Sequence, residues 1–267
     1  MYKFIWNNQK CFLNARYRIL LFNIDKRVGF ADFKLKPAII NYFRSMLKAV
    51  GIYKKYDQLV VLKGVDISIT KGEIVSIVGS SGAGKSTFLY QIGLLDHPSD
   101  GEIVIDGLKT STFSQDERTH FRLKEFGFVF QDYALLPEMS ALENVALPLL
   151  MANMDKKHAY KKAADALDKV KLGHRLNNLP SQLSGGEQQR VSIPRAVAHA
   201  PKILFADEPT ANLDNESSRT VMAIFQELHK SGQTIIMVTH EEEYARLAEK
   251  IIMMDDGLIV SEHKTRL

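Results

Sequence analysis

The segment "IVSIVGSSGAGKSTFLYQIG", Ile74 to Gly93, restricts the possible folds of this 267-residue chain more than any other. A short apolar run comes first, then a glycine-rich patch that fits the pattern G-x-x-x-x-G-K-[ST], then a helix-like stretch. An unbroken apolar run is typical of a strand buried on both faces, as in a parallel sheet. The segment therefore predicts an α/β fold in which a strand leads through a phosphate-binding loop into a helix.

The predicted loop supplies nine candidate nucleotide-binding residues. Its glycines permit backbone angles that other residues resist, so that the loop amides can point at phosphate oxygens near the start of the helix. Lys85 is predicted to reach the β- and γ-phosphates, and the Ser86 hydroxyl is predicted to ligand Mg²⁺. The nine residues are Gly79, Ser80, Ser81, Gly82, Ala83, Gly84, Lys85, Ser86 and Thr87. A chance glycine-rich turn is the alternative, which the rest of the chain argues against.

A second apolar run, within "KILFADEPT" (Lys202 to Thr210), ends in two acids. A phosphate-binding loop needs a neighbouring strand that carries an acid for Mg²⁺. Asp207 is predicted to hold the metal through water, and Glu208, one residue past the strand end, is predicted to polarise an attacking water. The alternative is a solvated acidic pair without a chemical role.

The segment "LSGGEQQR", Leu183 to Arg190, lies just upstream. With the two earlier motifs it resembles the ATP-binding cassette family, over roughly residues 46–260. The resemblance implies an ATPase with a P-loop NTPase core and a mostly parallel sheet, an antiparallel β subdomain and an inserted helical subdomain. It also implies that Ser184, Gly185 and Gly186 open a helix that acts on the ATP of a second copy of the domain, so that two copies form a head-to-tail dimer.

Smaller landmarks of the family are matched one by one. The resemblance implies that Gln131 touches Mg²⁺ and the water, that His240 contacts the γ-phosphate, and that Asp214 crosses to the other subunit. Tyr56 would stack on adenine, with Tyr53 as an alternative. The expected catalytic residues are Glu208 as general base, His240, Gln131 and Lys85; the expected metal ligands are Ser86, Gln131 and Asp207; the expected cofactors are ATP and Mg²⁺.

The segment "LLPEMSALENVALPL" resembles the lipoprotein-releasing, macrolide-export and cell-division group of cassettes. That resemblance implies an integral membrane permease with few transmembrane helices as partner, a peripheral place on the cytoplasmic face of the membrane, and work in export or lipoprotein release. A non-transport ATPase that controls cell-wall remodelling through a similar permease stays open as an alternative. Chromosome-maintenance ATPases carry a long coiled coil between their motifs, but only 98 residues separate Lys85 from Leu183 here, with no sustained heptads.

Composition changes sharply near residue 45. Residues 1–45 hold nine Lys/Arg, two Asp and 10 of the 24 aromatic residues, so the rest of the chain is net acidic although the whole carries +4. The positive charge therefore does not predict a nucleic-acid partner. Because "MLKAVGIYKKYDQ", from Met46, resembles a usual start for this family, residues 1–45 are interpreted as a mis-called start or as a basic, disordered arm on an anionic membrane surface. We expect residues 46–267 to form the nucleotide-binding domain, with the helical subdomain at about 132–195.

Cysteine usage and hydropathy set two further limits. A single Cys, Cys11, excludes a disulfide framework and indicates a reducing compartment. The sequence contains no run of 18 or more apolar residues, so it does not predict a membrane-spanning helix.

Three local patterns predict details of the structure. Ser114 and Glu117 fit a capping box, and "DGEIVIDGL" has the paired Asp-Gly turns of an antiparallel strand. Pro194 falls inside the helix expected to start at Ser184 in the "LSGGEQQR" signature, and a proline inside a helix costs about 3 kcal/mol. A kink or local break near Arg190 is therefore expected, and Pro194→Ala is expected to stabilise the domain.

Overall fold

The computed structural model describes residues 5–6, 9–10 and 45–265. The chain divides into two compact units, Met1–Tyr42 and Phe43–Leu267. In the first unit, β1 (Ile5–Trp6) and β2 (Gln9–Lys10) pair as two short antiparallel strands. The other expectations for residues 1–44 lie outside the described residues.

The second unit is built on a six-stranded sheet with the strand order β12-β11-β5-β10-β9-β8. Five of its strands are parallel, and only β12 runs antiparallel, against β11. The predicted loop-bearing strand β5 therefore lies in the interior of the sheet, next to β10. The strands are β5 (Ile74–Val78), β8 (Phe126–Val129), β9 (Ile203–Asp207), β10 (Thr234–Val238), β11 (Lys250–Asp255) and β12 (Leu258–Lys264).

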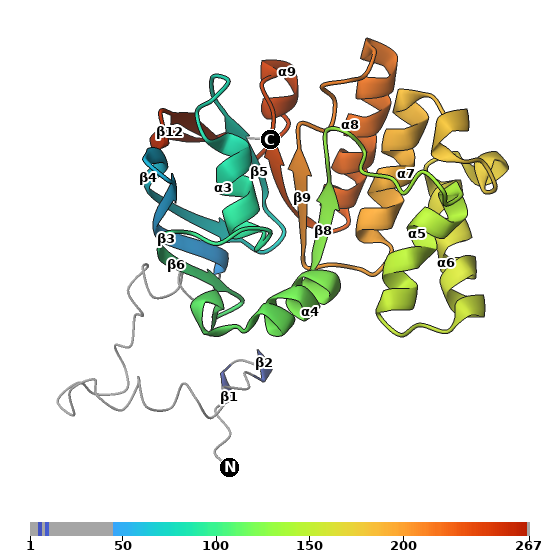
Figure 1. Cartoon of the computed structure of the whole chain (residues 1–267), viewed down its shortest axis with the longest axis horizontal. Helices are drawn as coiled ribbons and strands as arrows, with labels where there is room; N and C mark the ends of the chain where they lie inside the picture. Colours follow the sequence, from blue (N-terminus) through green and yellow to red (C-terminus); the bar gives the residue numbers. More distant parts are fainter. Residues whose placement is uncertain (1–4, 7–8, 11–44, 266–267) are drawn as a thin grey trace. The chain divides into compact units, whose positions relative to one another are not determined.

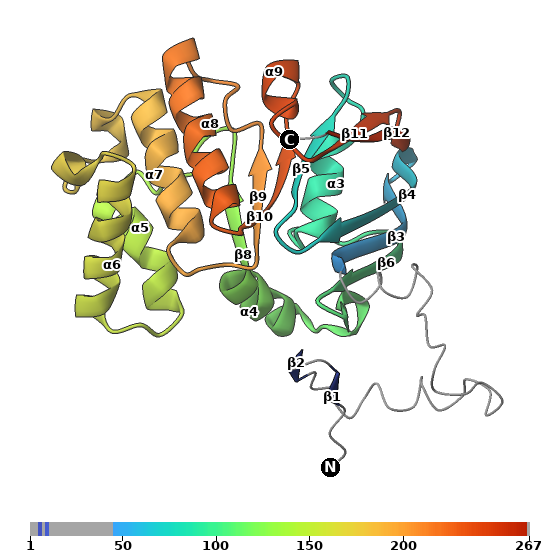
Figure 2. The same ribbon diagram turned by 180° about the vertical axis from the view of Figure 1, so that it is seen from behind.

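Successive side chains of these strands enter two different cores, as the two-residue period of a strand requires. Val75, Phe205 and Val238 pack on one face with helix α3 (Lys85–Ile92), whereas their neighbours pack on the other face. That second face is covered by three helices, which lie on the side of the sheet opposite α3 (Figures 1 and 2). They are α7 (Gly185–Val197), α8 (Asn215–Lys230) and α9 (Glu242–Ala245).

A second sheet is antiparallel, with the strand order β4-β3-β6-β7. Its apolar side chains share the core of α3, so this helix is enclosed between the two sheets (Figure 1). The strands are β3 (Ser45–Tyr56), β4 (Leu59–Thr70), β6 (Asp100–Ile105) and β7 (Leu108–Lys109). The turn η3 (Thr110–Thr112) and helix α4 (Gln115–Glu125) follow, and α4 carries the predicted capping box between Ser114 and Glu117.

A helical segment is inserted between β8 and β9 and has a core of its own. Ala163, Leu167 and Val170 are buried in this core. The segment consists of α5 (Ala141–Met151), α6 (Lys156–Lys169), the turns η4 (Gly173–Arg175) and η5 (Pro180–Gln182), and the first turns of α7. The predicted fold class, with its parallel core, antiparallel β subdomain and helical subdomain, is therefore confirmed.

Helix α7 passes through Pro194 without a break. The Arg190 carbonyl loses its partner four residues on, because proline has no N–H. However, Val191, Ile193 and Ala196 are all buried on either side of the proline. Packing of both flanks into the core holds the helix together where local propensity alone would end it.

Among the residues that the structure describes, no helix is both long and apolar enough to cross a membrane.

Candidate active site

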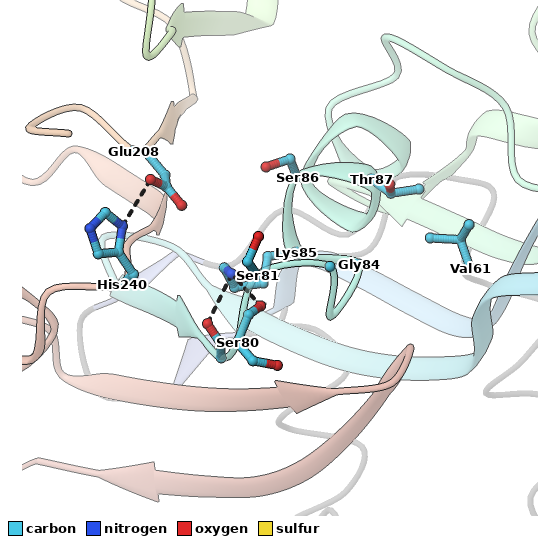
Figure 3. Close-up of a pocket in the computed structure, with 11 residues that line it drawn as sticks. Val61, Ser80, Ser81, Gly84, Lys85, Ser86, Thr87, Glu208 and His240 are labelled. Carbon is cyan, nitrogen blue, oxygen red and sulfur yellow. Dashed lines mark hydrogen bonds and ion pairs between the residues drawn. The ribbon is translucent and has the colours of Figure 1, made fainter. Parts of the chain in front are cut away.

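The loop between β5 and α3 encloses one end of a cavity of about 720 Å³ (Figure 3). Gly79 must be glycine, because a Cβ atom there would lie 2.0 Å from the Met254 carbonyl oxygen. Gly84 has φ +92°, and a Cβ atom there would lie 3.1 Å from the Val61 carbonyl oxygen of β4. The cavity is lined by Val61, Gly79, Ser80, Ser81, Gly82, Gly84, Lys85, Ser86, Thr87, Glu208 and His240. Of the nine predicted loop residues, only Ala83 is outside this lining, since its side chain is buried.

Helix α3 differs from its neighbours at its first residue. It starts after Gly84, which provides no side-chain cap. Within the described residues, the five other helices of more than one turn, α4 to α8, all have a Ser or Asp that accepts a backbone amide at this position. The first amides of α3 are therefore left for a ligand, and the helix dipole favours an anion there.

Lys85 lies at the floor of the cavity. Its ammonium donates to the carbonyl oxygens of Gly79 at 2.9 Å and Ser80 at 2.8 Å, so it folds the loop over the helix start (Figure 3). Its position next to the free amides concentrates positive charge at one point, which suits the phosphates of a nucleotide.

Asp207 is reached from this cavity through Ser86. The Ser86 hydroxyl donates to Asp207 Oδ1 at 2.8 Å, which brings two predicted metal ligands together. The Tyr90 hydroxyl donates to the other oxygen, Oδ2, at 2.7 Å. Burial of Tyr90 and its contact with Asp207 raise the pKa of the phenol. Two hard oxygen ligands at this distance fit Mg²⁺, which usually takes one or two protein oxygens and completes its shell with phosphate and water.

Glu208 and His240 meet at the opposite wall of the cavity. His240 Nδ1 lies 2.9 Å from Glu208 Oε2 (Figure 3). Glu208 has a left-handed backbone, with φ 45°, and its amide donates to the Val238 carbonyl at 3.0 Å. This unusual turn directs the carboxylate toward the cavity directly after the strand ends. A carboxylate placed beside an anion-binding loop can accept a proton from water.

The loops that carry Glu208 and His240 are also joined behind the cavity. The hydroxyl of the buried Thr210 donates to Glu241 at 2.5 Å. The end of β9 and the end of β10 are thus fixed to one another by two side-chain contacts.

Gln131 lies in a neighbouring cavity of about 510 Å³ that also contains Tyr90 and Asp207. It follows β8 and is exposed, and it does not line the cavity of Lys85. Its loop is held by Arg195 of α7, whose guanidinium donates to the carbonyls of Tyr133, at 2.8 Å, and Ala134. Both of these residues have left-handed backbones, with φ 63° and 48°.

Tyr56 ends β3 and lies outside the lining of the Lys85 cavity, as does Tyr53. Its hydroxyl donates to Asp96 at 2.9 Å, and the Lys54 ammonium stands 4.8 Å from its ring centre. Asp96 also accepts hydrogen bonds from Gln91 of α3, from the His97 amide and from Lys54. Burial opposes ionisation of Asp96, but these donors hold its pKa well below the ordinary range.

The signature residues Ser184, Gly185 and Gly186 line neither cavity and form the start of helix α7. The Ser184 hydroxyl accepts the Glu187 amide at 3.2 Å in a capping box. Gly185 and Gly186 permit close packing, because a Cβ atom would lie 2.7 Å from the Tyr133 hydroxyl and 2.4 Å from the Ser217 hydroxyl, respectively. These three signature residues do not line the cavity that contains Lys85.

Asp214 caps α8 and lies next to the signature. It accepts the amides of Glu216 at 3.0 Å and Ser217 at 2.9 Å, and these hydrogen bonds lower the pKa of its carboxyl. Ser217 thus connects Asp214 to Gly186. The Gln131 loop joins the same group, because Asn212 donates to the Gln131 carbonyl at 3.1 Å.

Tyr90 and Val61 line these cavities but are not among the candidates predicted from the sequence. The sequence contains a signal for Tyr90, because residues four apart lie on one face of a helix and Ser86 is already a candidate ligand. Val61 comes from β4, and no pattern in the sequence relates that strand to the loop.

A parallel sheet with an uncapped glycine-rich loop, a neighbouring acid at a strand end and a carboxylate beside it defines a P-loop nucleotide triphosphatase. Comparison with known families matches residues 62–211 to the family described as "ABC transporter". The chain belongs to that family, as its ATP-binding, ATP-hydrolysing subunit.

Individual relatives are similar over most of this chain. The lipoprotein-releasing system ATP-binding protein LolD of Aquifex aeolicus is 45% identical over 217 residues, which are 81% of this chain and 97% of LolD. The macrolide export ATP-binding/permease protein MacB of a Shewanella species is 44% identical over 82% of this chain, but the chain spans only 34% of MacB. These relatives place the chain in the lipoprotein-release and macrolide-export group, and they do not favour the cell-wall alternative.

Solved structures agree with the fold. The dimeric ATP-binding cassette MJ0796, in a post-hydrolysis state with ADP and Pi bound, superposes with a TM-score of 0.78 at 42% identity, covering 83% of this chain and all of that one.

Proposed function

We propose that the Lys85 cavity hydrolyses ATP with Glu208 as the general base. The observation that carries this proposal is that one cavity contains the phosphate-binding loop, Glu208 and His240. Loop amides and Lys85 hold the β- and γ-phosphates, and Glu208 orients water for in-line attack on the γ-phosphate. His240, which is in contact with Glu208, senses the γ-phosphate, and Gln131 enters from the neighbouring cavity.

Ser86 and Asp207 would hold Mg²⁺, with Gln131 completing the protein contribution. Their oxygens are already 2.8 Å apart, which supports a shared ligand. The bound ion supplies charge neutralisation at the phosphates. Tyr56 would stack on the adenine, held in place by its hydrogen bond to Asp96.

The working unit is proposed to be a head-to-tail dimer. Ser184, Gly185 and Gly186 do not line the Lys85 cavity, which supports a role for them toward the nucleotide of another copy. In a head-to-tail dimer the start of α7 would face the nucleotide of the other copy, and Asp214 would cross beside it. ATP would then bind two copies together, and hydrolysis would release them.

The partner is proposed to be an integral membrane permease with few transmembrane helices, and the place of work the cytoplasmic face of the membrane. Resemblance to LolD and MacB supports lipoprotein release or export as the process that is driven. Residues 46–267 are proposed to form the nucleotide-binding domain, with the helical subdomain at about 132–195, and residues 1–45 an extension. The complete burial of Leu47 within β3 supports a boundary near Ser45.

One variant tests both the role of Glu208 as the general base and the assignment to a membrane transporter. A tagged Glu208→Gln variant should bind ATP, hydrolyse it poorly and accumulate as a closed dimer, because glutamine keeps the shape of the side chain but cannot accept the proton. Membranes of the native host, solubilised with ATP and Mg²⁺, should release it with a permease that has a large outer domain. Hydrolysis at the wild-type rate would reject Glu208 as the base. Recovery with ribosomes, DNA or no membrane protein at all would reject the transporter.

A further inference from the structure

Helix α3 presents two hydroxyl groups to one carboxylate. Ser86 and Tyr90 are four residues apart, so they lie on the same face of the helix, one turn above the other. Ser86 donates to Asp207 Oδ1 at 2.8 Å and Tyr90 to Asp207 Oδ2 at 2.7 Å. Asp207 is only 5% exposed, and each of its two carboxylate oxygens accepts one of these hydrogen bonds.

The Tyr90 side chain is itself held in place. Its ring is partly buried against the core that α3 shares with both sheets. Its backbone carbonyl accepts the amides of Leu95, at 2.9 Å, and Asp96, at 3.2 Å, where the chain leaves α3. The phenol therefore reaches Asp207 from a fixed base, and Tyr90 lines the cavity that contains Gln131.

The two hydrogen bonds have different consequences for a metal ligand. The terminal torsion of an aspartate is broad, so a carboxylate with a single contact can turn about its Cβ–Cγ bond. A serine hydroxyl has one proton and two lone pairs, so Ser86 can exchange or keep its bond to Asp207 when it ligands a cation. The phenol of Tyr90 is outside the proposed ligand set and can hold Oδ2 throughout.

We infer that Tyr90 is a positioning residue for the metal site: its hydroxyl fixes the plane of the Asp207 carboxylate, and thereby the geometry in which Asp207, through water, and Ser86 hold a divalent cation. The inference rests on the metal ligands given under the proposed function. Hydrogen bonds to ligating carboxylates typically affect metal affinity by 10- to 100-fold.

The alternative role for Tyr90 is packing alone. Tyr90→Phe separates the two roles, because it keeps the ring and removes only the hydroxyl. The matched control is Tyr160→Phe, which removes a hydroxyl from α6 in the helical subdomain, in a different core. Asp207→Asn reports on the metal site itself.

The experiment measures the affinity of the full chain for a fluorescent, non-hydrolysable ATP analogue, once with Mg²⁺ and once with EDTA. The ratio of the two affinities isolates the contribution of the metal. We expect Tyr90→Phe to reduce this ratio by about tenfold, with the affinity in EDTA unchanged. Tyr160→Phe should change neither quantity. Electron paramagnetic resonance of Mn²⁺ bound with the same analogue gives a second readout, since a freer carboxylate should alter its spectrum.

Each other outcome overturns the inference in a distinguishable way. If Asp207→Asn lowers the ratio and Tyr90→Phe does not, Tyr90 only packs, and the proposed metal ligands stand. If Tyr90→Phe weakens binding equally with and without Mg²⁺, the hydroxyl supports the loop in general and not the metal site. If Asp207→Asn leaves the ratio unchanged, the proposed metal ligands fail and the inference fails with them.

Discussion

His240 Nδ1 lies 2.9 Å from Glu208 Oε2, which connects the ends of two neighbouring parallel strands across the wall of the cavity. The contact gives Glu208 a partner that restricts its rotation in an otherwise strained turn. A change in either residue should therefore affect the orientation of the other.

Replacement of His240 by alanine should separate binding from hydrolysis. The phosphate-binding loop stays intact, so ATP affinity should be preserved, but loss of the contact to Glu208 should reduce single-turnover hydrolysis by about a hundredfold. His229→Ala is the matched control, because His229, on α8, pairs with Glu249 outside the cavity. Hydrolysis by His240→Ala at the wild-type rate would contradict this role.

Replacement of Pro194 by alanine should raise the melting temperature. The variant restores a donor for the Arg190 carbonyl, worth up to about 3 kcal/mol, but loses some packing, since the ring is buried. We expect a net gain of about 1–2 kcal/mol, or several degrees for a domain of this size. Pro148→Ala, inside α5, offers a parallel case. A melting temperature that stays unchanged or falls in Pro194→Ala would reject the expectation.

The Arg195 guanidinium should stabilise the loop that carries Gln131. Arg195→Met keeps much of the side-chain length but leaves the Tyr133 and Ala134 carbonyls without their donor, which should cost about 1–3 kcal/mol in denaturant unfolding. Arg246→Met is the control, because Arg246 forms an exposed pair with Glu242 on α9, and such pairs contribute about 0–1 kcal/mol. Equal effects of the two variants would mean that the carbonyls find other donors.

Acid should weaken the fold partly through Asp96. Its pKa in the folded chain is lowered, so the ionised carboxyl stabilises the fold at neutral pH. That stabilisation is lost as the pH falls below the ordinary value of 3.8 toward the lower value of the folded state. Asp96→Asn should therefore be less stable than the wild type at pH 7, and the difference should shrink in acid. Urea unfolding at several pH values measures it, with Asp165→Asn, exposed on α6, as control. A difference that is constant with pH would argue against an ionised Asp96.

The sequence predicted the parts of the site that depend on local order. Gly79 to Thr87 and Asp207 to Glu208 belong to contiguous motifs with fixed chemistry, each at the end of an apolar run that predicts a strand. The relations of Tyr90 to Asp207, Arg195 to Tyr133 and Tyr56 to Asp96 join segments far apart in the chain. These contacts depend on how helices pack against sheets, and a pattern within one segment of the sequence does not predict that packing.

Pro194 illustrates the opposite limit. Local propensity predicts a break at this residue, but it does not include the burial of Val191 and Ile193, which holds α7 continuous. The expected increase in stability of Pro194→Ala stays a prediction, whereas the expected break in α7 does not occur.

The uncapped start of α3 has a consequence for the life of the protein in the cell. Every other long helix in the described residues carries its own side-chain cap, whereas α3 has none, so a bound phosphate group would supply the partners for its first amides. A ligand that binds only the folded chain lowers the fraction that is open to proteases. We therefore expect nucleotide supply to govern how long each copy survives as well as how fast it works, so that energy-starved cells would clear this subunit sooner than well-fed ones.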